Sequence, residues 1–173
     1  MLSVLVIDES RSRAGEICAG LALAGYQVAA ILAGSERLSA EVEKLQPDVI
    51  LIDTDSPSRD TLENLAAMHR NMPRPIVIFT QDDGQAMIRD AVKAGVSAYI
   101  VDGLDPRRIK PIIEVARARF EDRQALRREI DEVSRKLSDR KLLDKAKGVL
   151  MKARGIDEDA AYHAMRKLAM ERG

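Results

Sequence analysis

The chain has 173 residues, 46% of them hydrophobic, which is enough for one packed α/β domain and a smaller appended unit. No apolar run reaches the ~18 residues of a membrane span, and the first residues lack the basic segment of a signal peptide. The single Cys18 excludes an internal disulfide, and neither His69 nor His163 has metal-ligand spacing. These features predict a cytoplasmic protein.

The net charge of zero hides an uneven distribution of charge along the chain. Residues 1–105 contain 9 basic and 16 acidic residues, whereas residues 134–173 contain 11 basic and 6 acidic residues. A basic tail is suited to a polyanion such as a nucleic acid, but an ordinary solvated surface has a similar composition. Charge alone leaves both interpretations open.

Short apolar, β-rich segments alternate with helix-length segments over the first two thirds of the chain. Gly25 and Gly95 occupy positions typical of helix C-caps, and Asp105 followed by Pro106 is typical of a helix start. These βα units predict a doubly wound, five-stranded parallel sheet of the α/β class. The expected strands are Val4–Ile7, Gln27–Leu32, Val49–Ile52, Ile76–Thr80 and Ala98–Val101, and the expected helices cover residues 11–24, 35–45, 60–71, 84–94 and the chain from 106 onward.

Polar side chains follow the expected strands, at the sheet edge where doubly wound folds gather their chemistry. Asp8 and Glu9 follow the first strand, Asp53 ends the third and Thr80 ends the fourth. This arrangement resembles the receiver domain of response regulators, a flavodoxin-like fold, over residues 1–118. The resemblance implies that Asp53 is the phospho-acceptor position and that Thr80 and Tyr99 are switch positions. It also implies that Asp8, Glu9 and Asp53 bind Mg²⁺, as a possible rather than a required cofactor.

One position departs from the receiver pattern. The family has a lysine at the end of the fifth strand, and this chain has Asp102 there. Two like charges ~4 Å apart repel by about 4 kcal/mol at an effective dielectric constant near ~20, which disfavours a phosphoryl group on Asp53. We therefore expect a docking and dimerisation domain. The alternative is a phosphorylation-controlled response regulator that acts through Asp53.

Two further functions are weaker alternatives. Asp53 and Asp55 resemble the Asp-x-Asp motif of haloacid-dehalogenase phosphatases, but no distal lysine constellation or cap domain follows. No helix-turn-helix pattern indicates DNA binding. We therefore expect neither enzymatic activity nor a DNA partner.

A helical pattern continues from residue 105 to about residue 154. Its seam alternates spacings of three and four residues, as in a coiled coil. We expect a parallel two-stranded coil over residues 119–138 that joins a homodimer; a helix packed on its own domain is the alternative. The seam consists of Ile109, Ile112, Ala116, Arg119, Arg123, Leu126, Ile130, Val133 and Leu137.

The last segment, residues 139–173, predicts two helices separated by Gly155, with Asp157 as the N-cap of the second. Lys141, Lys145, Gly148 and Lys152 form one stripe on the first helix. Glycine within a helix costs about 1 kcal/mol relative to alanine, so close approach of a ligand or another backbone is the expected compensation. From the residues alone, a solvated stripe and a helix-packing glycine explain the pattern equally well.

The string Ala146-Lys147-Gly148-Val149-Leu150-Met151, followed by Gly155, Ala161-Tyr162 and Met165–Met170, resembles the ANTAR module of bacterial transcription antiterminators. Such modules bind paired hairpins in leader RNA, which prevents a terminator from forming. ANTAR modules have three helices, so we expect an incomplete module here that lacks its third helix. The resemblance implies RNA binding by Lys141, Lys145, Ala146, Lys147, Gly148, Lys152 and Arg166.

The order of receiver, coil and ANTAR module, together with the segment 99–104, is most similar to the nitrate/nitrite-assimilation regulators of proteobacteria, the NasT type. That resemblance implies control of nitrate and nitrite assimilation genes. It also implies a protein partner, a nitrate/nitrite-binding sensor protein (NasS-like) that sequesters the regulator until its ligand binds.

Overall fold

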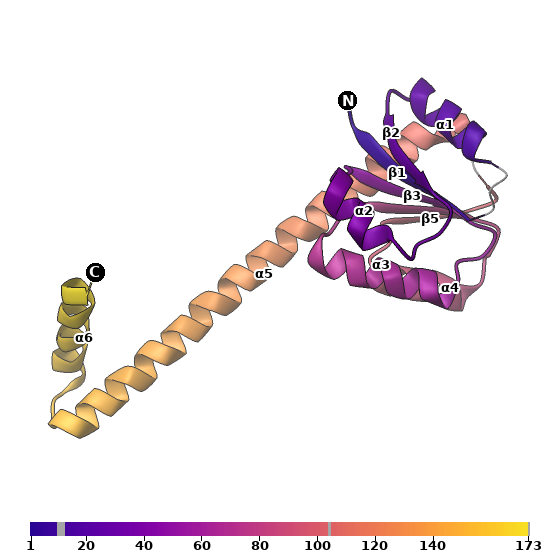
Figure 1. Cartoon of the computed structure of the whole chain (residues 1–173). Coiled ribbons are helices and arrows are strands. Elements are labelled where there is room, and N and C mark those ends of the chain that lie inside the picture. Colours follow the sequence, from indigo (N-terminus) through magenta and orange to yellow (C-terminus); the bar gives the residue numbers. More distant parts are fainter. Residues whose placement is uncertain (10–12, 104, 173) are drawn as a thin grey trace. The chain divides into compact units, whose positions relative to one another are not determined.

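The computed structural model of the chain describes residues 1–9, 13–103 and 105–172 (Figure 1). The chain divides into two compact units, Met1–Arg123 and Gln124–Gly173. The first unit holds the β-sheet, and the second unit is helical. In the described part of the chain, no helix is both long and apolar enough to cross a membrane.

The first unit is built on a five-stranded sheet whose paired strands all run parallel, in the order β2-β1-β3-β4-β5. The predicted doubly wound sheet is therefore confirmed. The central strands are rich in β-branched residues and are buried along their length, as a sheet covered on both faces requires. The strands are β1 (Ser3–Asp8), β2 (Gln27–Leu32), β3 (Val49–Asp53), β4 (Ile76–Thr80) and β5 (Ala98–Val101).

Helices cover both faces of this sheet (Figure 1). Helices α2 (Leu38–Leu45), α3 (Arg59–Asn71) and α4 (Gln85–Lys93) enclose one apolar core, which includes Val42 and Leu65. Helix α1 (Ala14–Leu23) and the first turns of α5 (Pro106–Arg154) enclose the other. The predicted start of the first helix near residue 11 lies outside the described residues.

The caps that the sequence indicated are present. Gly25 and Gly95 follow α1 and α4 with φ of +84° and +97°, a conformation that favours glycine. Asp105 starts α5, since its Oδ1 accepts a hydrogen bond from the backbone N–H of Arg107 at 3.0 Å. Helix α2 begins three residues later than expected because a turn precedes it, with the N–H of Leu38 bonded to the carbonyl of Ser35.

The first turns of α5 belong to the core of the first unit. Ile109, Ile113 and Ala116 are fully buried, and they pack with α1 and the sheet. The Tyr26 hydroxyl donates a hydrogen bond to Glu114 at 2.7 Å, which anchors the same turns. This part of the predicted seam therefore packs on its own domain and is not available to a partner helix, because the sheet face needs a second covering helix.

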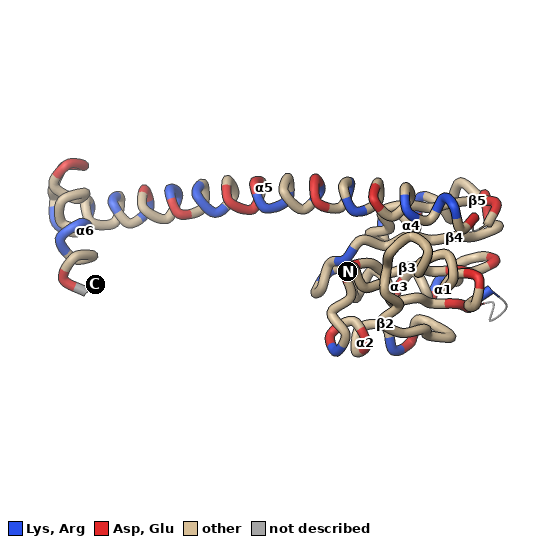
Figure 2. The backbone as a smooth tube through the Cα atoms, turned by 90° about the horizontal axis from the view of Figure 1, so that it is seen from above, with Lys and Arg blue, Asp and Glu red and all other residues tan. Residues whose placement is uncertain are grey.

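The second unit consists of the rest of α5 and of α6 (Glu158–Arg172). Gly155 ends α5 with φ of +59°, and the Asp157 carboxylate caps α6 by accepting a hydrogen bond from the N–H of Ala160 at 2.8 Å. Both predicted helix boundaries are confirmed. Acidic and basic residues are interspersed along the exposed part of α5 (Figure 2).

Candidate functional site

Two of the predicted acidic residues meet at the carboxyl edge of the sheet. Asp8 and Asp53 end the adjacent strands β1 and β3 and lie opposite each other in the parallel register. Both are buried, with exposed fractions of 2% and 0%. The buried carboxylate of Asp53 requires a proton or a cation nearby, because burial and the neighbouring negative charge both disfavour its charged form.

Arg13 supplies one such cation. Its Nε donates a hydrogen bond to Asp53 Oδ2 at 2.9 Å, and its Nη2 lies 3.6 Å from Asp55 Oδ1. Burial raises the pKa of Asp53, Arg13 opposes that rise, and the charges of Asp8 and Asp55 add to it. The other Asp53 oxygen, Oδ1, is buried without a hydrogen-bond partner among the described residues.

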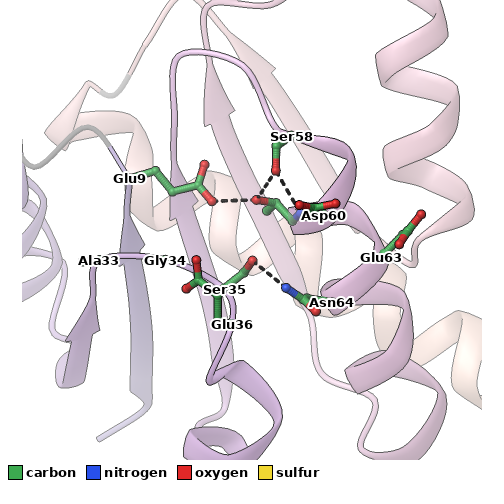
Figure 3. Close-up of a pocket in the computed structure, with 10 residues that line it drawn as sticks. Glu9, Ala33, Gly34, Ser35, Glu36, Ser58, Asp60, Glu63 and Asn64 are labelled. Carbon is green, nitrogen blue, oxygen red and sulfur yellow. Dashed lines mark hydrogen bonds between the residues drawn. The ribbon is translucent and has the colours of Figure 1, made fainter.

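Glu9 does not join Asp8 and Asp53 in this structure. Its carboxylate accepts a hydrogen bond from the Thr61 hydroxyl in the first turn of α3 at 2.7 Å. There it lines a separate, open cavity of about 640 Å³ together with Glu36, Asp60 and Glu63 (Figure 3). Across residues 1–9, 13–103 and 105–172, no three histidine, cysteine or acidic side chains are gathered as a metal cluster.

Thr80 and Tyr99 fasten the ends of β4 and β5 to neighbouring loops. The Thr80 hydroxyl donates to the carbonyl of Asp55 at 2.8 Å and accepts from the N–H of Asp82 at 3.1 Å. The Tyr99 hydroxyl donates to the carbonyl of Asp82 at 2.9 Å. Burial, followed by the charge of Asp82, raises the pKa of Tyr99. Both side chains are therefore held by backbone groups of two loops.

Asp102 lies in a left-handed turn, and its side chain is exposed. Its φ is +69°, and the φ of the following Gly103 is +82°. The charged groups that shift the pKa of Asp53 are Arg13, Asp8 and Asp55. Like-charge repulsion on Asp53 comes from Asp8 and Asp55, and the effect predicted for Asp102 on phosphorylation stays a prediction.

Sequence reasoning missed two residues of this edge, Arg13 and Asp82. Asp82 accepts hydrogen bonds from the Ser56 hydroxyl at 2.6 Å and from the N–H of Gly84 at 2.8 Å, and these bonds lower its pKa. The available signal for Arg13 was a basic side chain closely following the acidic pair Asp8-Glu9. For Asp82 it was the Asp-x-Gly spacing, which is typical of a turn.

The predicted RNA-binding residues divide into an exposed and a partly covered group. Lys141, Lys145, Lys152 and Arg166 are exposed. Ala146, Lys147 and Gly148 are half-buried, and the last two line a groove of about 600 Å³ between α5 and α6, which also contains Tyr162. The exposed lysines project from α5, where a phosphate backbone has access to them.

Lys147 is already paired within the second unit. Its Nζ lies 3.0 Å from Glu158 Oε1 and 3.4 Å from Asp144 Oδ1. The hydrogen bond to Glu158 raises the pKa of Lys147, so this side chain stays charged while it joins α5 to the start of α6. Its geometry is that of a helix-connecting ion pair.

Gly148 has no close neighbour in the chain that excludes a side chain. A Cβ at this position meets no atom of the described structure within 4 Å. Packing of α6 on α5 therefore does not require a glycine at this position. A contact of Gly148 with RNA or with another helix stays a prediction.

Comparison with known proteins identifies both parts of the chain. The response regulator receiver domain family matches residues 4–114, and the ANTAR domain family matches residues 131–173. The sheet and its acidic edge define a receiver domain. The chain therefore belongs to the response regulator receiver family and, more particularly, to those members that carry an ANTAR domain.

Curated relatives agree with this assignment. The transcriptional regulatory protein PdtaR of Mycobacterium tuberculosis is 31% identical over 149 residues, which cover 86% of this chain and 72% of that protein. The chemotaxis protein CheY of Thermotoga maritima is 25% identical over 107 residues, which cover 61% of this chain and 89% of CheY. The first match extends across both domains.

Solved structures share the fold of the receiver part. A CheY-like receiver domain protein of Methanospirillum hungatei aligns with a TM-score of 0.61 at 21% identity, covering 71% of this chain and 98% of that chain. A pilus assembly-related protein of Burkholderia pseudomallei aligns with a TM-score of 0.62 at 24% identity, covering 69% and 91%. At these identities the likeness establishes the fold alone.

Proposed function

We propose that the chain is an RNA-binding transcription antiterminator that binds paired hairpins in leader mRNA and so prevents termination. The ANTAR match supports the proposal, as does the regulatory role in the name of the mycobacterial relative. The observation that carries it is the exposed stripe of Lys141, Lys145 and Lys152, interrupted by Gly148, where the described residues leave room for a side chain.

The chemistry of this stripe suits a folded RNA loop. Lysine side chains bind phosphate oxygens without regard to sequence, whereas splayed loop bases are recognised by stacking and by their exposed edges. A bare helix backbone at Gly148 lets a ribose or base come closer than any side chain allows. Tyr162, which is exposed beside the groove, offers a ring for stacking.

A gel shift with a two-hairpin, hexanucleotide-loop leader RNA tests this proposal, with loop-scrambled RNA as the control for specificity. Lys145→Glu removes a phosphate contact, so we expect weaker binding. The slope of the logarithm of the binding constant against the logarithm of the salt concentration should fall in magnitude by about 1. Lys110→Glu is the matched control, because Lys110 is an exposed lysine on the same helix within the first unit. Equal losses in both variants, or no preference for the loops, would reject the RNA surface.

Gly148→Ala separates RNA binding from folding. Alanine at an open helix position stabilises the helix by about 1 kcal/mol, so we expect a more stable protein that binds RNA less tightly. Thermal unfolding measures the first effect and the gel shift measures the second. Unchanged RNA affinity would show that Gly148 lies outside the contact surface.

We also propose a homodimer formed through the exposed part of α5. Leu126, Ile130, Val133 and Leu137 alternate spacings of four and three residues, and each exposes more than half of its surface. A second copy presents the same ridge, and two such ridges interlock as a parallel coiled coil. Dimerisation then places two RNA-binding modules together, which suits a ligand made of two hairpins.

The inducing signal that we propose is nitrate or nitrite, sensed by a separate binding protein that sequesters the regulator. The similarity of residues 99–104 to nitrate/nitrite-assimilation regulators supports this choice. Size-exclusion chromatography of the chain mixed with such a sensor protein tests it. We expect one complex without nitrate and two separate peaks with nitrate; separate peaks in both conditions would reject the partner.

A further inference from the structure

The carboxylate of Asp53 needs a counter-charge wherever the receiver edge is folded. Its side chain is fully buried at the end of β3, next to the buried Asp8. An unpaired charge in such a site is strongly disfavoured, and the group must bind a proton, a metal ion or a cationic side chain. In the receiver family the usual cation is a divalent metal, assisted by the lysine that this chain lacks.

Arg13 supplies the counter-charge for Asp53 in this chain. The 2.9 Å hydrogen bond from its Nε to Asp53 Oδ2 is a charge-assisted contact, and the guanidinium continues to the exposed Asp55 at 3.6 Å. The arginine backbone is fixed as well, since the carbonyl of Arg13 accepts a hydrogen bond from the N–H of Ile17 in the first turn of α1. The side chain is only 25% exposed.

The residues of this edge do not fit a divalent cation in the described arrangement. A hard cation binds several oxygen ligands at once. One Asp53 oxygen is taken by Arg13, and the Glu9 carboxylate is taken by the Thr61 hydroxyl. Within the described ranges of the chain, no cluster of three potential ligands remains.

We propose that Arg13 is a built-in counter-cation that neutralises Asp53 and closes the acidic pocket to magnesium. The arginine supplies by an ion pair the positive charge that a metal ion supplies in other receivers, and it occupies Oδ2 of Asp53. Magnesium then binds at Asp53 only when the Arg13 side chain moves away from that carboxylate. This inference is independent of RNA binding, because it concerns the first unit alone.

Calorimetric titration with MgCl₂ alone tests the proposal on the whole chain. Arg13→Gln removes the cation but keeps a long polar side chain, so we expect it to bind Mg²⁺ at least about tenfold more tightly than the natural chain, which corresponds to the shift that one adjacent cation imposes on a carboxylate. Arg59→Gln is the matched control, since Arg59 is an exposed arginine paired with Glu63 at 2.8 Å. It should leave Mg²⁺ binding unchanged.

A second measurement keeps the proposal testable if Arg13→Gln does not fold. In a ¹H–¹⁵N spectrum of the natural chain, the Nε–H of Arg13 should be protected from exchange with water, and Asp53→Ala should abolish that protection. Arg59 provides the comparison, because its Nε–H is exposed and should exchange rapidly in both proteins. Equal Mg²⁺ affinity of the natural chain and Arg13→Gln, or an unprotected Arg13 Nε–H, would overturn the proposal.

Discussion

The two parts of α5 carry the same kind of apolar pattern, but the structure uses them differently. In the first unit, Ile109, Ile113 and Ala116 are completely buried against the sheet and α1. In the second unit, the ridge that contains Ile130 exposes more than half of each apolar side chain. The first pattern is covered by the sheet and α1 of the same chain, whereas the second is exposed to solvent.

This difference shows what a seam in a sequence does and does not specify. Apolar residues at spacings of three and four predict a buried helix face, but they do not say whether a sheet or a second helix covers it. The polar pair Arg119 and Arg123 lies between the two parts, and Arg123 is the last residue of the first unit. The interruption therefore lies where α5 passes from a buried to an exposed apolar pattern.

The largest expected effect comes from truncating the buried part. Ile113→Ala leaves a cavity in a packed core, so we expect it to lower the free energy of unfolding of the receiver domain by about 2–5 kcal/mol. Ile130→Ala at low protein concentration should change it by no more than about 0.5 kcal/mol, as is usual for surface positions. Urea unfolding followed by circular dichroism measures both.

For self-association the expected effects are reversed: Ile130→Ala should have the larger effect and Ile113→Ala the smaller. Ile130→Ala should weaken the dimer in sedimentation equilibrium, because it removes one ridge residue from each copy. Ile113→Ala should leave the dimer affinity unchanged at concentrations of denaturant where the receiver is still folded. A chain that is monomeric at every concentration, with or without Ile130, would show that the exposed ridge does not serve dimerisation.

A smaller effect is expected at the hydrogen bond that anchors the buried part. Tyr26→Phe removes the 2.7 Å bond to Glu114, and bonds to charged groups contribute about 1.5–3 kcal/mol to stability. Burial and the bond to Glu114 raise the pKa of Tyr26 from 10.0 to about 12. The folded chain therefore holds this proton more tightly than the unfolded chain, and stability should fall between pH 10 and 12.

The pH dependence distinguishes this role from simple packing. Phenylalanine has no proton to lose, so Tyr26→Phe should not show the decrease in stability that deprotonation of Tyr26 causes between pH 10 and 12. Any decrease caused by other titrating groups should remain. Glu114→Gln keeps a hydrogen-bond acceptor and should behave as an intermediate case. Identical pH profiles for the natural chain and Tyr26→Phe would contradict the bond.

The sequence predicts the fold well because local chemistry determines its boundaries. Gly25, Gly95 and Gly155 adopt positive φ, and Asp157 caps α6, all as the residue types indicate. The parallel sheet follows from five apolar segments with helical connections. Each of these inferences depends on neighbours in the chain, which a sequence displays directly.

The candidate sites were only partly predictable, because a long side chain has several potential partners within its reach. Asp8 and Asp53 lie together because the parallel register of β1 and β3 pairs them. Glu9 does not join them, since it accepts a hydrogen bond from Thr61 in α3. Arg13 reaches Asp53 across forty positions of sequence. Lys147 in turn pairs with Glu158 of the next helix. Spacing along the chain does not encode which of these contacts is made.

The smallest expected effect concerns the start of α6, which the second unit holds by local contacts. Asp157→Ala removes the bond to the N–H of Ala160, and losing such an N-cap costs about 1 kcal/mol. We expect α6 to fray from its first turn, seen as faster amide exchange at Ala160 and Ala161, with the receiver unchanged. Asp159→Ala, within the first turn, loses only the helix-dipole interaction and should have about half the effect. If both variants behave alike, the cap does not fix α6, and the ion pair between Lys147 and Glu158 holds it instead.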